Sequence, residues 1–210
     1  MERTKSKIPF VGLHAHSVAG SVFDGFGYPQ EHMDFAYENG MSALALTDHG
    51  NMNGMSYQVL HAKKMKAEGK EFKPIFGVEA YFTPSIVDWK KEYEKIKADK
   101  KQAKKVINDT DKVEVEDEAS SKSKTKSKVD NKRHIVLLAK NQQGLNNIYK
   151  IVSDSHRGDN FYRKPRLDYD MLKKYGDGIV ASSACLGGVY AGDYWDNYED
   201  GEEAVLDAMR

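Results

Sequence analysis

The chain has 210 residues, of which 40% are hydrophobic and 30% are charged, a composition that allows one domain with a buried core. Its 32 basic and 32 acidic side chains cancel to a formal net charge of zero, which argues against a nucleic-acid binder driven by overall charge. The single cysteine excludes an internal disulfide, and no apolar run approaches the roughly 18 residues of a membrane span, so we expect a soluble, cytoplasmic protein.

Short apolar runs alternate with helix-like segments along most of the chain. The apolar runs, which we predict to be strands, cover residues 10–13, 42–46, 75–78, 135–139 and 178–182. The helix-like segments cover residues 30–39, 52–67, 143–153 and 169–175, and another such pattern begins at Gly201. Gly40 and Gly69 follow the first two segments, as expected where helices end. Because strands alternate with helices, the sequence predicts an α/β fold with a mainly parallel sheet.

One stretch, residues 88–133, interrupts this alternation and is rich in Lys, Glu, Asp and Ser. Its first part, residues 88–107, contains good helix formers and is compatible with a polar helix. Its second part has too little apolar area to offset the entropy of ordering, so we expect a flexible insertion. A solvated loop is the simpler interpretation and a basic arm that touches nucleic acid is the alternative, although the acidic residues at 114–118 argue against a simple phosphate clamp.

Side chains that bind metals follow the predicted strands. The residues that come just after these strands are His14, His16, His49, Glu79 and Cys185. Because the carboxyl ends of parallel strands meet at one face of a sheet, we expect these side chains to lie close together. Asp24, in a glycine-rich segment, can reach the same face, whereas His134 precedes its strand and is the exception.

The spacing of His14 and His16 points to a metal site, because two residues apart on an extended chain their side chains face the same side. Imidazoles, carboxylates and one thiolate suit zinc, manganese or iron better than calcium or magnesium. Each residue also has a simpler interpretation: a buried histidine commonly serves the core, Glu79 can pair with a lysine, and Cys185 can act as a small apolar residue. Asp48 can orient a metal-bound histidine or cap a helix.

In order and surroundings, these residues resemble the PHP (polymerase and histidinol phosphatase) family. The closest resemblance is to the N-terminal PHP domain of the alpha subunit of bacterial and phage replicative DNA polymerase III. The matching segments are 13–17 (LHAHS), 23–25 (FDG), 45–51 (ALTDHGN), 75–81 (IFGVEAY), 134–141 (HIVLLAKN) and 183–188 (SACLGG). Two more segments, 144–148 (GLNNI) and 162–168 (YRKPRLD), favour the polymerase branch over stand-alone phosphatases.

The resemblance implies a distorted (β/α)7 barrel that is incomplete at the C-terminus. Residues 1–87 and 134–210 are then the two parts of the barrel, and residues 88–133 are an insertion. The resemblance also implies up to three divalent metal ions, zinc or manganese. By matching positions, the ligands are His14, His16 and Glu79 for the first metal, Glu79, His134 and Cys185 for the second, and Asp24 and His49 for the third. Two further family ligands, an Asp and a His, are expected beyond Arg210, as in a truncated or split chain.

The activity that the resemblance implies is metal-assisted phosphoester hydrolysis, with a metal-bound water positioned by Glu79, His134 and Cys185. Arg166, or Lys164 near it, can clamp a phosphate, with a structural salt bridge as the alternative for Arg166. In the polymerase branch this chemistry implies a 3′–5′ exonuclease, with DNA 3′ ends and the remaining polymerase domains or replisome subunits as partners. Two alternatives stay open: a stand-alone phosphatase for small phosphomonoesters such as histidinol phosphate, and an inactive module that metal only stabilises.

Overall fold

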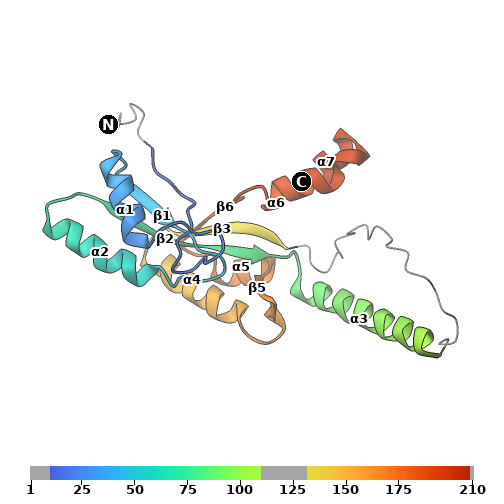
Figure 1. The fold of residues 1–210 in the computed structure, drawn as a ribbon. Helices are drawn as coiled ribbons and strands as arrows, with labels where there is room; N and C mark the ends of the chain where they lie inside the picture. The colour runs from blue at the N-terminus through green and yellow to red at the C-terminus, as the bar shows by residue number, and fades with distance from the viewer. Residues whose placement is uncertain (1–9, 110–131, 209–210) are drawn as a thin grey trace, which may run out of the picture.

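The structure of the protein is a computed structural model that describes residues 10–109 and 132–208. Within these residues, five strands follow the order β4-β5-β2-β3-β6 and a sixth, β1, pairs with β2 (Figure 1). The strands are β1 (Ala43–Leu46), β2 (Lys73–Phe82), β3 (Arg133–Ala139), β4 (Phe161–Tyr162), β5 (Lys164–Leu167) and β6 (Ile179–Ser182). The helices are α1 (Pro29–Glu38), α2 (Met55–Ala67), α3 (Ile86–Asp109), α4 (Gln142–Ser155), α5 (Tyr169–Tyr175), α6 (Val189–Asn197) and α7 (Glu202–Ala208). No helix in these two stretches is long and apolar enough to cross a membrane.

The helices begin and end where local chemistry favours it, and the predicted helices are confirmed to within about three residues at each end. The side chain of Asn141 accepts a hydrogen bond from the Gly144 N–H at 2.9 Å at the start of α4. Asp168 accepts one from the Met171 N–H at 2.9 Å at the start of α5. After α1, Gly40 has a φ of 83°, which glycine adopts without steric cost.

The sheet is mixed, so the prediction of a mainly parallel sheet is wrong. β1 and β5 run parallel to β2, whereas β3 runs antiparallel to β2 and β6 runs antiparallel to β3. The reason is the connection after β2: α3 leads away from the end of the sheet (Figure 1), and the chain re-enters as β3 at that same end. As a result, the first residue of β3, Arg133, pairs with the last residue of β2, Phe82.

Two other predictions concern segments at the margins of the sheet. Residues 10–13 do not form a regular strand, since only Gly12 pairs with Leu44, although the Ala15 carbonyl still accepts a hydrogen bond from the Thr47 N–H at 2.8 Å. The polar helix predicted for residues 88–107 is confirmed as part of α3. The flexible part predicted after it falls on residues 110–131, outside the described residues.

The main core lies on one face of β2 and β3, where α4 and α5 cover the sheet. The buried residues of this core are Val78, Ala80, Phe82, Leu137, Ile148, Ile151, Leu167 and Met171. Since side chains alternate along a strand, Glu79 and Tyr81 point to the other face of β2. That second face carries the predicted metal ligands.

Candidate metal centre

Four segments meet where β2 ends and β3 begins. His49 follows β1 and pairs with Glu79 of β2 in an isolated bridge. His134 stands near the start of β3, and Cys185 lies on the turn after β6, which returns to β3 through an isolated bridge between Gly188 and His134. His134, expected to be the exception, joins the others because β3 is antiparallel to β2. The structure thus brings together all seven predicted ligand residues: His14, His16, Asp24, His49, Glu79, His134 and Cys185.

The carboxylate of Glu79 is at the middle of the cluster and is fully buried. Its Oε2 lies 3.3 Å from His14 Nε2, 3.1 Å from His16 Nε2 and 2.9 Å from His49 Nδ1. Its Oε1 lies 3.0 Å from His134 Nδ1. One carboxylate is therefore shared by four imidazoles that come from three different parts of the chain.

Asp24 and Cys185 extend the cluster on its two sides. Asp24 Oδ2 lies 2.6 Å from His49 Nε2, the ring nitrogen that does not face Glu79. Cys185 Sγ lies 3.6 Å from Glu79 Oε1 and 3.5 Å from His134 Nδ1. The Cys185 thiol, the Glu79 carboxylate and the His134 imidazole therefore all contact one another.

The turn that carries Cys185 is sterically constrained. Ala184 has a φ of 61°, a left-handed conformation that costs a non-glycine residue free energy. The Gly187 N–H donates a hydrogen bond to the sulfur at 3.3 Å. A Cβ at Gly188 would lie 1.7 Å from the Ser183 carbonyl oxygen, so this position has no room for a side chain.

Three atoms of the cluster are buried without a hydrogen bond to any described residue, namely His14 Nε2, His49 Nδ1 and Glu79 Oε2. Their separations are short, but their lone pairs and hydrogens are not aligned with one another. Buried polar atoms without a partner are rare and call for an ion or an ordered water. The ligand atoms that lie within 4.8 Å of one another form three groups: His14, His16 and Glu79; His16, Asp24 and His49; His49, Glu79 and His134. The donor set and the orphaned atoms both fit a divalent metal centre.

The charges of the cluster shift the pKa values of its members. Burial raises the pKa of Glu79, but the contacts from the four imidazoles, His134 foremost, outweigh burial and hold this pKa well below its usual value. The contact with Glu79 raises the pKa of His49, with burial opposing it and Asp24 adding to it. Burial raises the pKa of the Cys185 thiol, and the negative charge of Glu79 adds to that effect. A buried carboxylate surrounded by imidazole nitrogens favours a cation at this place.

Asp48 supports the cluster through hydrogen bonds to Ser17 and Ser21. Its carboxylate accepts hydrogen bonds from the Ser17 N–H at 2.6 Å, the Ser17 hydroxyl at 2.8 Å and the Ser21 hydroxyl at 3.0 Å. The Ser21 oxygen also accepts the His49 N–H at 3.0 Å and lies 3.4 Å from His16 Nδ1. Asp48 therefore links the segments of His16 and His49, which favours an orienting role over helix capping.

Tyr81 borders the cluster, although it is not one of the site residues predicted from the sequence. Its ring stacks on His49, with centroids 5.9 Å apart, and meets the edge of His134 at 5.3 Å. Lys164 Nζ lies 5.1 Å from the centre of the same ring. The signal was available, since Tyr81 stands two residues after Glu79 in one strand and so shares its face.

The guanidinium of Arg166 is buried against backbone carbonyls and an aromatic ring, which favours a structural role over the predicted phosphate clamp. The residue is 1% exposed, and its guanidinium donates to the carbonyls of Tyr162 at 2.6 Å and Lys164 at 3.2 Å. It also lies over the Trp89 ring at 4.2 Å. The planar guanidinium therefore holds the start of α3 against the β4–β5 hairpin, whereas the exposed Lys164 lies over Tyr81, which borders the cluster.

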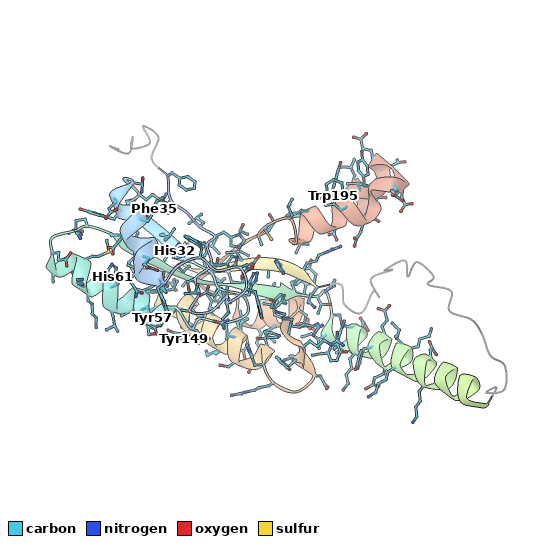
Figure 2. All side chains as sticks on the ribbon, viewed as in Figure 1. His32, Phe35, Tyr57, His61, Tyr149 and Trp195 are labelled. Atoms are coloured by element: carbon cyan, nitrogen blue, oxygen red, sulfur yellow. The ribbon has the colours of Figure 1, made fainter. Side chains whose placement is uncertain are left out.

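The remaining histidines lie outside the three ligand groups. His32 and His61 stand on α1 and α2 (Figure 2), and His61 Nε2 contacts Asp34 Oδ1 at 2.8 Å. His156 follows α4, and its Nδ1 lies 2.8 Å from the Val152 carbonyl oxygen. These contacts agree with the packing and surface roles expected for them.

Comparison with known proteins identifies the family. The PHP domain model matches residues 12–209. The chain belongs to the PHP domain family. This PHP domain is 37% identical to DNA polymerase III subunit alpha of Aquifex aeolicus over 180 residues, which are 86% of this chain and 12% of that protein. It is 32% identical to the same subunit of Borreliella burgdorferi over 198 residues, which are 94% of this chain and 14% of that protein.

The PHP domain therefore spans 12% to 14% of the length of these relatives. An amidohydrolase from Chromobacterium violaceum aligns with it at 17% identity and a TM-score of 0.34, over 67% of this chain and 32% of that one, a likeness too low to carry an argument. The family resemblance and the α/β fold predicted from the sequence are confirmed, and the domain is homologous to the N-terminal region of the alpha subunits.

Proposed function

We propose that this PHP domain is a metal-dependent phosphoesterase that removes nucleotides from DNA 3′ ends. The observation that carries the proposal is the buried Glu79 carboxylate, which contacts four imidazoles while its Oε2 makes no hydrogen bond to the part of the chain that the structure describes. A cation bound among these donors would remove the free-energy cost of burying this oxygen without a hydrogen-bond partner. The names of the relatives, which are replicative polymerase subunits, direct the proposal to DNA.

The proposed ligand assignment follows the contacts. His14, His16 and Glu79 would hold one metal, Glu79, His134 and Cys185 a second, and Asp24 and His49, with His16 beside them, a third. Imidazole and thiolate donors favour zinc, and the carboxylates and imidazoles also suit manganese. The Cys185 thiol must lose its proton to act as a ligand, so loading of the second group releases a proton.

The residues of the chain would divide the work of hydrolysis among them. Divalent metals, when bound at such a centre, polarise a phosphoester and activate water for attack on phosphorus. Lys164 is exposed beside Tyr81 and would attract a phosphate as a flexible point charge. Tyr81 restricts the imidazoles of His49 and His134 by packing on them, and Asp48 fixes the two serine-bearing turns.

We further propose that the domain works with the other parts of a replicative polymerase in the cytoplasm. The support is that both relatives are DNA polymerase III alpha subunits of which this chain matches only a small share. In this proposal residues 1–87 and 134–210 form the PHP barrel. Residues 88–133, which begin with the outward-pointing α3 (Figure 1), are the insertion.

The test is metal analysis of the purified chain, together with an assay that follows the shortening of a 5′-labelled single-stranded oligonucleotide with zinc or manganese. Glu79→Gln keeps the shape of the side chain and removes its charge, so we expect loss of both bound metal and cleavage. His156→Gln replaces a histidine outside the cluster and should change neither. Metal without cleavage would point to a structural site, and absence of metal from the unaltered chain would refute the assignment.

A further inference from the structure

The loop that carries Asp24 presents large apolar side chains to solvent. Phe23 is 101% exposed, Phe26 is 88% exposed and Val22 is 76% exposed. Burial of an aromatic ring is strongly favourable, so a pair of rings left fully in water beside a polar site suggests a binding partner.

The backbone of this loop is well anchored. The Val18 N–H donates to the Gly27 carbonyl at 2.9 Å and closes the loop. The Gly25 N–H donates to the Ser21 carbonyl at 2.6 Å. A Cβ at Gly25 would lie 2.4 Å from the Ser17 carbonyl group, so the loop packs against its own first residue. Binding through such a loop therefore costs little backbone conformational entropy.

The rings stand next to the metal centre. Phe23 directly precedes Asp24, whose carboxylate lies 2.6 Å from His49 Nε2, and neighbouring Cα atoms are about 3.8 Å apart. The cation of Lys164 lies over Tyr81, which packs on the same His49 ring. An aromatic pair, a phosphate-binding cation and the phosphoesterase centre are therefore close together.

We propose that Phe23 and Phe26 form a stacking platform for the bases of single-stranded DNA. This inference rests on the proposed function and names the residues that hold the substrate of that centre. Stacking on aromatic side chains, combined with a cation that follows the backbone, is the way in which proteins bind single strands without reading sequence. Leu186 is 82% exposed on the turn of Cys185 and adds a second apolar contact beside the centre.

Single-stranded DNA fits these features better than the alternatives. In a duplex the bases stack on each other and offer no free face to a ring on the protein. A small phosphomonoester has no group that extends from the centre to the loop. The platform therefore predicts a preference for single-stranded oligonucleotides over small esters, carried by binding and not by the hydrolytic step.

The experiment compares the unaltered chain with Phe23→Ala, Phe26→Ala and the double variant. Phe35→Ala is the matched control, because Phe35 is also an exposed phenylalanine, 52% exposed, and lies on α1 (Figure 2). Fluorescence anisotropy with a labelled oligothymidylate in EDTA measures binding without cleavage. Hydrolysis of bis(p-nitrophenyl) phosphate with manganese measures the centre alone. We expect about tenfold weaker DNA binding for each ring removed, unchanged ester hydrolysis, and no effect in the control.

The outcomes separate this inference from the proposed function. Unchanged DNA affinity in the double variant, or no DNA binding by the unaltered chain, would overturn the platform. An equal loss of ester hydrolysis in the double variant would also overturn it, since the loop and not the rings would then be responsible. DNA binding that depends on the rings, with no hydrolysis of either substrate, would support the platform and refute the proposed function.

Discussion

Removal of the Asp48 carboxylate should weaken the metal centre without changing any proposed ligand. Asp48 is 3% exposed and accepts three hydrogen bonds, two from Ser17 and one from Ser21. In Asp48→Ala the three donors stay buried without an acceptor, because Ser17 is 0% exposed and Ser21 is 4% exposed. Hydrogen bonds to charged groups contribute about 1.5–3 kcal/mol each, so we expect a loss of about 3–5 kcal/mol after partial rearrangement.

Asp48→Asn separates the number of hydrogen bonds from the charge. The amide oxygen can still accept from the Ser17 N–H and the Ser21 hydroxyl, while the amide nitrogen can donate to the Ser17 oxygen, which rotates to accept. Only the contribution of the charge is lost, so we expect a decrease of about 1–2 kcal/mol in the free energy of unfolding. Urea unfolding of the metal-free chain, followed by circular dichroism, measures both variants.

Zinc affinity gives the second measurement on the same variants. Because Ser21 contacts both His16 and the His49 N–H, we expect Asp48→Ala to weaken zinc binding by about 10- to 100-fold and Asp48→Asn to retain most of it. Ser85→Ala, which removes the hydrogen bond that caps the start of α3 away from the cluster, is the control; it should lower the free energy of unfolding by about 0.5–2 kcal/mol and leave zinc affinity unchanged. The reasoning is refuted if Asp48→Ala lowers the free energy of unfolding by less than about 1 kcal/mol, or if Asp48→Ala and Asp48→Asn lower it equally.

Three other predictions address the turn, the protons and the insertion. Gly188→Ala should lower zinc affinity in a chelator competition, because the new Cβ would meet the Ser183 carbonyl at 1.7 Å and displace the turn with the thiol; unchanged affinity would show that the turn adapts. Zinc affinity from calorimetric titration should fall from about pH 8 to about pH 6, since contact with Glu79 raises the pKa of His49 and a proton competes with the metal. Equal zinc affinity at the two pH values would contradict this account. The raised pKa of His49 also affects the metal-free protein: protonated His49 stabilises the fold fully below its unfolded pKa of 6.5, and this stabilisation is lost as the pH rises through the higher pKa of the folded state. Trypsin should cut first within residues 112–132, and resistance there under native conditions would show that the segment is ordered.

The ligand residues could be predicted from their order along the chain, but their geometry could not. The position just after a strand identifies His49, because strand ends meet at one edge. The apolar run places Glu79 just after a strand as well, whereas in the structure β2 continues to Phe82 and contains Glu79. The approach of His134 depends on the direction of β3, which the alternation of apolar residues does not encode, since period-2 patterns read the same in either direction. The path of the long connection between β2 and β3 decides the direction of β3.

Arg166 and the segment around it show a second limit of sequence patterns. The apolar pattern does not predict the β4–β5 hairpin, because its strands are two and four residues long and β5 carries Lys164 and Arg166. A guanidinium in such a segment is usually solvated. Its burial follows only from the tertiary approach of Trp89 on α3, a residue far away in the sequence.

The antiparallel β3 also decides which donors the centre contains. His134 is the second of the seven residues of β3, so with the opposite direction it would stand about 13 Å away, near the far end of the strand. Glu79 Oε1 would then lose its imidazole, and Cys185 would lose the partner with which it forms the second ligand group. A connection that leaves and re-enters the sheet at one end is thus a requirement of the centre. Its length matters little, because the entropy cost of closing a loop grows only slowly with the number of residues. The fold can therefore accommodate a long charged connection beside the proposed metal centre, provided that the end of β2 and the start of β3 stay paired.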